Sequence, residues 1–167
     1  GLQCQNCAKR RNIWFAVRAL IQRVNQARVL IDGKIVGEIG KGMVVFLGVG
    51  KNDSSTDIDF MVRKIPQLRI FDDAQGKMNI SLNEIQGEIL LISQFTLYGN
   101  CRRGLRPSYD EAATPREAQN FYNQVAQKLR DQDLTIAEGV FGAMMQVELC
   151  NDGPVTILLD SKERRQA

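Results

Sequence analysis

A proline near the C-terminal end of the chain interrupts sequence that otherwise has the pattern of a strand. Gly153 and Pro154 lie between two apolar runs, Met144 to Leu149 and Val155 to Leu159, and both runs are typical of strands. Proline has no backbone N–H to donate to a neighbouring strand, so the chain must bend, bulge or adopt a cis peptide here. The pattern therefore predicts two strands joined by an irregular element.

The chemistry open to this chain is restricted because it contains no histidine. This excludes Ser-His-Asp and Cys-His nucleophilic arrangements and every histidine-ligated metal site. A hydrolase built from this sequence must use backbone donors, hydroxyls, carboxylates, Lys or Arg, or a group of its own substrate.

Length and composition indicate one globular domain. The 167 residues are 44% apolar and 25% charged, which suffices for a single core. The net charge of +3 tolerates a phosphate-bearing partner but is far from polybasic. No run approaches the roughly 18 apolar residues of a membrane span, so we expect a cytoplasmic protein with no membrane contact.

The cysteines give little support for a metal site. Cys4 and Cys7 form a Cys-x-x-Cys pair, but a second pair and histidine are both missing. We expect reduced thiols, no metal and no cofactor. Lys9, Arg10 and Arg11 nearby, without any acid in residues 1–16, also leave a transit-peptide interpretation open.

The first third of the chain predicts antiparallel strands. Arg18 to Val24 and Arg28 to Ile31 alternate apolar and polar residues, and Asp32-Gly33 favours a tight turn into Ile35-Val36. Met43 to Val49 is apolar throughout, which is typical of a central strand covered on both faces.

The middle of the chain predicts a first helix and two further strands. Thr56 and Asp59 have the spacing of a capping box, and apolar residues follow at helical spacing until Pro66. We expect a short strand over Leu68 to Phe71 and a buried strand over Glu88 to Ser93.

A loop and a second helix follow. Residues 98–114 are loop-like, and their arginines are either solvated or form a phosphate grip. Thr114 and Pro115 with Glu117 predict a helix start, because they supply a hydroxyl cap, a proline at the first position and a capping glutamate. The loop arginines are Arg102, Arg103 and Arg106.

These elements predict a mixed α/β fold of about eight strands. We expect mainly antiparallel β-sheets packed together with a helical layer on one side, a β-β-α sandwich. The domain is expected over residues 17–161, with an N-terminal extension at 1–16 and a short polar tail at 162–167.

Two motifs carry a resemblance to a known family. Ser93-Gln94-Phe95-Thr96-Leu97 ends a strand, and Asn151-Asp152-Gly153-Pro154-Val155-Thr156 surrounds the proline described above. They resemble the Ser-Gln-x-x-Leu and Asn-x-Gly-Pro-x-Thr motifs of bacterial-type D-aminoacyl-tRNA deacylases, also called D-tyrosyl-tRNA deacylases. The resemblance runs from Val17 to Ser161, and members usually begin near the position of Val17.

The resemblance implies hydrolysis of the ester that joins a D-amino acid to the 3′ end of tRNA, with glycyl-tRNA as a further candidate. Ser93, Gln94, Phe95 and Thr96 are the implied catalytic segment, with Gln94 and nearby backbone amides contacting the carbonyl and ribose. Thr96 is the implied hydroxyl nearest the ester. We favour a positioning role for Thr96 because the chain offers no side-chain base, although a nucleophilic role stays open.

The implied substrate-binding residues come from three segments. Gly153-Pro154 resembles the family's Gly-cis-Pro element, which one subunit of a homodimer inserts into the site of the other to exclude L-amino acids. Arg23 matches a family arginine that braces this element across the dimer interface, and Thr156 is a further implied support. The full set of implied substrate-binding residues is Asn151, Gly153, Pro154, Ala143, Met144, Met145 and Tyr109.

Each of these positions also has an ordinary structural interpretation. Met144 and Met145 match an adenine pocket in the family, but either methionine alone could equally pack in a core. Tyr109 stands where relatives often have phenylalanine.

Two alternative functions remain open. A related enzyme type removes L-alanine from tRNA but has proline in place of Ser93. A non-catalytic nucleic-acid-binding relative has a long C-terminal extension, whereas only residues 162–167 follow the last predicted strand here.

Overall fold

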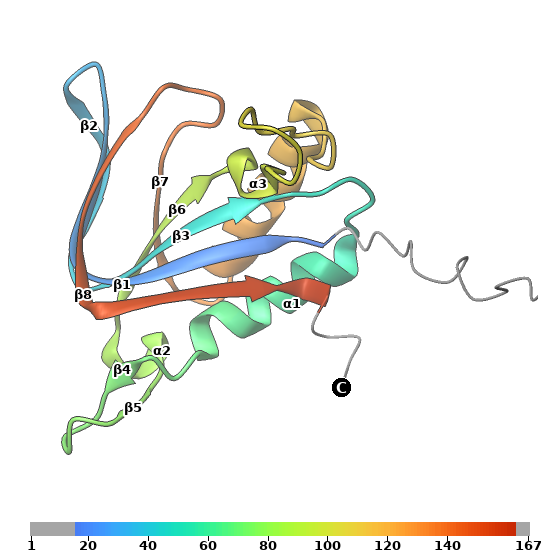
Figure 1. Cartoon of the computed structure of the whole chain (residues 1–167). Helices are drawn as coiled ribbons and strands as arrows, with labels where there is room; N and C mark the ends of the chain where they lie inside the picture. The colour runs from blue at the N-terminus through green and yellow to red at the C-terminus, as the bar shows by residue number, and fades with distance from the viewer. Residues whose placement is uncertain (1–15, 163–167) are drawn as a thin grey trace, which may run out of the picture.

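The protein is described here by a computed structural model, which covers residues 16–162 (Figure 1). The predicted Cys4 and Cys7 pair and nearly all of the predicted extension and tail lie outside these residues. None of the helices in the described part is long and apolar enough to cross a membrane.

The described chain forms eight strands and three α-helices, with a short 3₁₀ helix, η1, after the sixth strand. The elements are β1 Arg18–Ile31, β2 Lys34–Ile39, β3 Gly42–Gly48, α1 Ser55–Gln67, β4 Phe71–Asp72, β5 Met78–Ile80, α2 Leu82–Ile85, β6 Glu88–Ser93, η1 Phe95–Tyr98, α3 Pro115–Arg130, β7 Thr135–Glu138 and β8 Gln146–Asp160.

One six-stranded sheet forms the body of the molecule, in the order β2-β1-β3-β6-β7 with β8 paired to the other edge of β1. Strand β1 is antiparallel to β2, β3 and β8, whereas β3, β6 and β7 are parallel. A side chain at Gly37 of β2 would overlap the backbone of Glu138 in β7, so the sheet curls until its ends meet. The predicted mixed, mainly antiparallel α/β fold is confirmed.

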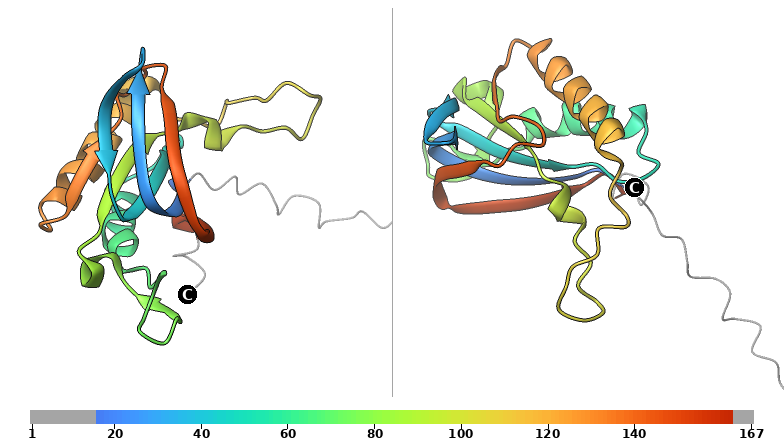
Figure 2. Two further views of the ribbon diagram at one scale, coloured as in Figure 1. Left: turned by 90° about the vertical axis from the view of Figure 1, so that its left-hand side faces the viewer. Right: turned by 90° about the horizontal axis from the view of Figure 1, so that it is seen from above.

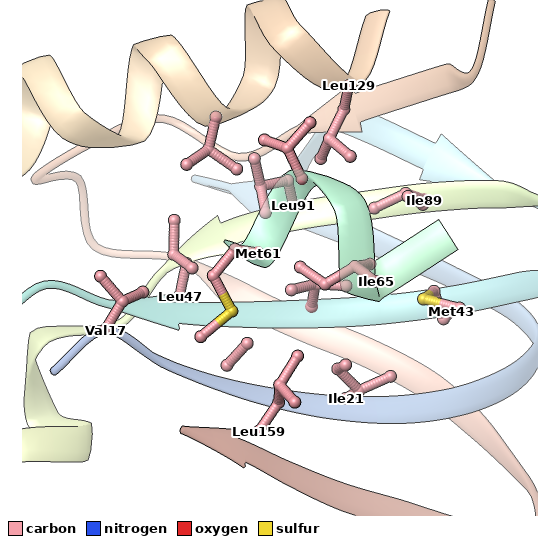
Figure 3. Close-up of a cluster of buried hydrophobic side chains, with 14 of the residues drawn as sticks. Val17, Ile21, Met43, Leu47, Met61, Ile65, Ile89, Leu91, Leu129 and Leu159 are labelled. Carbon is pink, nitrogen blue, oxygen red and sulfur yellow. The ribbon is translucent and has the colours of Figure 1, made fainter. Parts of the chain in front are cut away.

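Helices α1 and α3 lie against one face of the curled sheet, as the views in Figures 1 and 2 agree. The main core fills this layer: Met43 and Leu47 of β3 pack with Met61 of α1 and Leu129 of α3 (Figure 3). A second core, with Val44 of β3, lies on the opposite face of the sheet. Alternate residues of β3 therefore face two cores, which confirms that this strand is central.

The predicted turn between the first two strands is confirmed. Asp32 and Gly33 both have positive φ angles, of 49° and 77°, as a two-residue type I′ turn requires. Such a turn matches the right-handed twist of the strands it joins.

The first helix begins two residues earlier than predicted. Ser54 is the N-cap, and its backbone N–H donates to the carboxylate of Asp57 at 2.9 Å. The prediction that Thr56 and Asp59 form the capping box is wrong; Asp59 instead pairs with Lys128 of α3 at 2.9 Å. Ser54/Asp57 and Thr56/Asp59 have the same spacing, and the pair nearer the helix end satisfies the free N–H groups there.

Two strand boundaries also differ from prediction. The segment Leu68 to Phe71 is extended chain that becomes a strand only at Phe71–Asp72. Met144 and Met145 lie in irregular chain just before β8, and the two predicted C-terminal strands form this one strand with an interruption. Strands β5 and β7 and helix α2 escaped prediction because each has only three or four residues, too few to show a period.

Candidate functional site

A pocket of about 640 Å³ lies where β6 ends and the chain turns into η1. Its walls come from β6 and η1, from the start of α3 and from the turn before β8. Seven of the predicted site residues line it: Ser93, Gln94, Phe95, Tyr109, Ala143, Met144 and Met145. The fold therefore gathers three segments that are far apart in the sequence.

The strand end holds the predicted catalytic segment in place. Gln94 donates its backbone N–H to the carbonyl of Leu47 at 2.8 Å, which extends the parallel pairing of β6 with β3 by one residue. The carbonyl of Gln94 then accepts the N–H of Leu97 at 3.3 Å as η1 begins. The N–H groups of Phe95 and Thr96, at the first turn of η1, have no intrahelical acceptor.

Thr96 is exposed and follows the lining residue Phe95, but it is not itself one of the residues that line the pocket. Its hydroxyl accepts a hydrogen bond from the side-chain amide of Gln94. The two predicted residues are therefore linked, and a carboxylate or amine that could take a proton from Thr96 does not appear among its described hydrogen-bond partners.

The pocket wall is apolar and uncharged. Within the described part of the chain, Tyr109 is the one ionisable residue that lines it. The ring of Tyr109 meets Phe95 edge-on at a centroid distance of 5.0 Å. Met144 is 92% exposed at the mouth, which excludes core packing for this residue, whereas Met145 is half-buried and packs against the second core. Such a wall suits a flat or apolar group beside a few polar contacts.

One wall of the pocket was not predicted. Ala112, Ala113, Pro115 and Ala118 line it from the start of α3. The sequence signal was present, because Thr114 and Pro115 mark the helix start, but small residues at a helix start do not by themselves indicate a pocket.

Buried ionisable groups lie behind the site. Burial raises the pKa of Asp53 to about 7, and the charges of Asp57 and Asp160 add to this, while a hydrogen bond from the N–H of Gly50 opposes it. Burial also raises the pKa of Tyr122, whose hydroxyl donates to the carbonyl of Leu91 at 2.8 Å. Neither Asp53 nor Tyr122 lines the pocket.

A second group of predicted site residues surrounds a bulge in β8. Gln22 of β1 pairs with Thr156, and Val24 pairs with Asn151, so Arg23 alone stands opposite residues 152–155. The peptide bond between Gly153 and Pro154 is cis, and both residues are exposed. The predicted bulge and the predicted cis peptide therefore both occur.

Asn151 and Thr156 close the base of this bulge. The side-chain amide of Asn151 donates to the hydroxyl of Thr156 at 3.0 Å, and its carbonyl accepts the N–H of Val155 at 3.2 Å. The first and last residues of the Asn-x-Gly-Pro-x-Thr motif thus bond each other and fix the four residues between them.

Arg23 supports the bulge from below and is only 6% exposed. Its guanidinium donates to the carbonyl of Asp152 at 3.2 Å and lies 3.3 Å from the carboxylate of the same residue. It also donates to the carbonyl of Ile70 at 2.9 Å and to Asp72 at 3.2 Å. These contacts lie within one chain, whereas the prediction placed the support by Arg23 across the dimer interface.

The bulge and the pocket are separate features of the chain. None of Arg23, Asn151, Gly153, Pro154 and Thr156 lines the pocket among the described residues. A second hollow, of about 670 Å³, is lined by none of the predicted site residues.

Comparison with known proteins identifies the family. The profile of the family described as D-Tyr-tRNA(Tyr) deacylase matches residues 20–160. The chain belongs to this family. The family assignment made from the two motifs is confirmed.

Individual relatives agree with this assignment. A D-aminoacyl-tRNA deacylase of Thermosipho melanesiensis is 55% identical over 148 residues, which cover 88% of this chain and 99% of that protein. A D-aminoacyl-tRNA deacylase of Clostridioides difficile is 51% identical over 147 residues, with the same coverage. A solved structure named c-Myc DNA Unwinding Element Binding Protein has a TM-score of 0.82 and 42% identity, covering 86% of this chain and 98% of that one.

Proposed function

We propose that this chain hydrolyses the ester bond of D-aminoacyl-tRNA, releasing free tRNA and the D-amino acid, as a chirality proofreading step in translation. Glycyl-tRNA is a second candidate substrate. The observation that carries the proposal is the exposed Gly153-Pro154 bulge, fixed by its own motif residues, in a chain 55% identical to a D-aminoacyl-tRNA deacylase.

The pocket is suited to the 3′ end of an aminoacyl-tRNA. Its apolar wall, with Met144, Met145 and Ala143, offers a surface for the terminal adenine. Gln94 and the N–H groups of Phe95 and Thr96, which have no intrahelical acceptor, offer donors for the ester carbonyl and ribose. An aminoacyl ester is already activated, so positioned donors that stabilise the oxyanion can supply much of the catalysis.

Proton transfer is assigned to the substrate. The described pocket lining contains no carboxylate, lysine or arginine, and the chain contains no histidine. The ribose 2′-hydroxyl next to the ester is then the nearest group that can take part in general catalysis. Thr96 serves as a positioning group.

The active unit in this proposal is a cytoplasmic homodimer. Gly153 and Pro154 do not line the pocket of their own chain, and a two-fold pairing would bring the bulge of each subunit to the pocket of the other. The backbone carbonyls of the bulge would then meet the amino group of a D-residue and leave no room for an L side chain. The bulge is rigid enough for such exclusion because Arg23, Asn151 and Thr156 all hold it.

A DNA-binding function is the second candidate, because a relative at 42% identity is named for binding a DNA unwinding element. An L-alanyl-tRNA activity is less well supported, since Ser93 and Phe95 agree with the D-specific motif.

The direct test compares the loss of the ester from matched D-tyrosyl-tRNA and L-tyrosyl-tRNA. We expect rapid loss of the D ester only. Ala143→Trp, which places a large side chain in the pocket, is the inactive control. Equal cleavage of both esters would contradict chiral proofreading, and salt-sensitive DNA binding without hydrolysis of either ester would favour the second candidate.

A further inference from the structure

An arm made of residues 99–109 projects from the body of the protein, visible in both views of Figure 2 as the olive to yellow loop. Asn100 and Ser108 pair across its base, with backbone hydrogen bonds of 2.8 and 3.0 Å. Gly104 makes the turn at the tip with a φ of +70°. We call this segment the arginine arm.

The arginine arm concentrates positive charge. The chain has 22 basic and 19 acidic residues, and the arm has three arginines and no acid. Outside the arm, residues 16–162 hold 14 basic and 18 acidic residues, so the arm is basic while the rest of the described chain is acidic. Among the described residues, the three arm side chains make no ion pair and no side-chain hydrogen bond, and all three are exposed: Arg102, Arg103 and Arg106.

The root of the arm is fixed to the pocket wall. Tyr109, at the end of the arm, lines the pocket and contacts Phe95. The residues that follow are tied down by backbone bonds: Ala113 donates to the carbonyl of Val49 at 3.0 Å, and Lys51 donates to the carbonyl of Glu111 at 3.0 Å. The charged tip therefore has a defined direction from the pocket.

We propose that the arginine arm grips the sugar-phosphate backbone of the tRNA acceptor stem while the 3′ end occupies the pocket. This inference rests on the proposed function and extends it to a second contact outside the pocket. Unpaired arginines on a protruding loop match phosphate groups, which nucleic-acid backbones present every few ångströms. An extended segment of five residues reaches roughly 15 Å, so the tip contacts nucleotides beyond those in the pocket.

The alternative partner for the arm is a second copy of this chain, because Leu105 at the tip is a fully exposed apolar side chain. The observations favour RNA. The arm offers three unpaired arginines for phosphates but only one large apolar side chain for a protein partner, so its chemistry matches an RNA backbone better than a second copy.

The test measures KM for D-tyrosyl-tRNA at 50 and 200 mM salt in three proteins. They are the natural chain, the arm variant R102Q/R103Q/R106Q and the control K34Q/R63Q/K77Q, which loses three exposed charges elsewhere. If each arm arginine contacts one phosphate, the arm accounts for a roughly 20- to 40-fold rise of KM over this salt range. We expect the arm variant to lose that part of the salt dependence and the control to keep it.

A short substrate separates this inference from the proposed function. The D-tyrosyl ester of adenosine lacks the acceptor stem, so the arm variant should cleave it as fast as the natural chain. Failure of the natural chain to cleave either substrate would refute the proposed function itself. An arm variant whose KM keeps the salt dependence of the natural chain would refute the phosphate grip alone. An arm variant that is monomeric by sedimentation and slowed on both substrates would also refute it, because the arm would then bind a second copy of the chain.

Discussion

The guanidinium of Arg23 donates to the backbone carbonyl of Asp152 at 3.2 Å, so a buried side chain of β1 holds the exposed bulge of β8. We expect Arg23→Lys to lower the free energy of unfolding by about 2–4 kcal/mol, since one ammonium cannot satisfy all the buried acceptors. Urea unfolding measures this loss, and deacylation should fall with it.

Arg28→Lys is the matched control for Arg23. Arg28 is also on β1, but its partner Glu148 and its own side chain are about half exposed. Such a surface pair is worth less than about 1 kcal/mol. Equal losses in the two variants would contradict the supporting role of Arg23.

Gly153 is expected to tolerate no side chain. Its φ is +123°, and a Cβ there would lie 2.9 Å from Val155 and 3.0 Å from the guanidinium of Arg23. Gly153→Ala should therefore displace the bulge and weaken cleavage of D-tyrosyl-tRNA in a protein that still folds. Initial rates on the D and L esters measure the effect.

Gly33→Ala distinguishes backbone strain from crowding. Gly33 also has a positive φ, of +77°, but nothing lies within 4 Å of its missing Cβ. It should cost about 1 kcal/mol of stability and leave the rate unchanged. Unchanged rate and discrimination in Gly153→Ala would show that Gly153-Pro154 is only a turn.

Asp53 makes stability depend on pH below neutrality. Burial raises its pKa to about 7 in the folded protein, against 3.8 for the ordinary value, so the folded state holds this proton more tightly. Its contribution to stability is complete below pH 4, decreases as pH rises from 4 to 7 and is lost above that. Asp53→Asn should flatten the stability curve in this window.

Urea unfolding between pH 4 and 8 measures this effect, with Asp110→Asn as an exposed control. The control should keep the pH dependence of the natural chain. A slope unchanged in Asp53→Asn would show that other groups cause it.

The roles of Thr96 and the substrate 2′-hydroxyl can be separated. Because no base lies among the described partners of Thr96, Thr96→Ala should retain much of the activity. A D-aminoacyl-tRNA that lacks the terminal 2′-hydroxyl should react more slowly by a factor on the order of 10²–10⁴, because positioned proton transfer contributes about this much to a rate. Single-turnover rates measure both. Loss of turnover in Thr96→Ala, with normal reaction of the deoxy substrate, would identify Thr96 as the nucleophile.

The sequence predicted those features that depend on local pattern. The apolar run of β3, the Asp32-Gly33 turn and the capped start of α3 all occur as expected, because short-range periodicity and backbone preferences determine them. The two motifs also indicated which residues form the pocket and the bulge.

Features that depend on tertiary contacts were missed. The bulge itself was predicted, but its register was missed: one residue of β1 stands opposite four of β8, and no local pattern records this pairing. The wall formed by Ala112 and Ala113 exists only because α3 packs beside η1. The choice of Ser54 over Thr56 as N-cap likewise depends on where the chain leaves β3.

The central claim is that the pocket of one subunit and the Gly153-Pro154 bulge of another form one active site. Co-expression of Ala143→Trp, which blocks the pocket, with Gly153→Ala, which disturbs the bulge, gives a heterodimer that can be purified with two different tags. One of its two sites then combines an intact pocket with an intact bulge, so we predict about half of the natural D-tyrosyl-tRNA deacylation rate, with both parent homodimers far lower. A heterodimer no more active than its parents, or a natural chain that is fully active as a monomer, would contradict the claim.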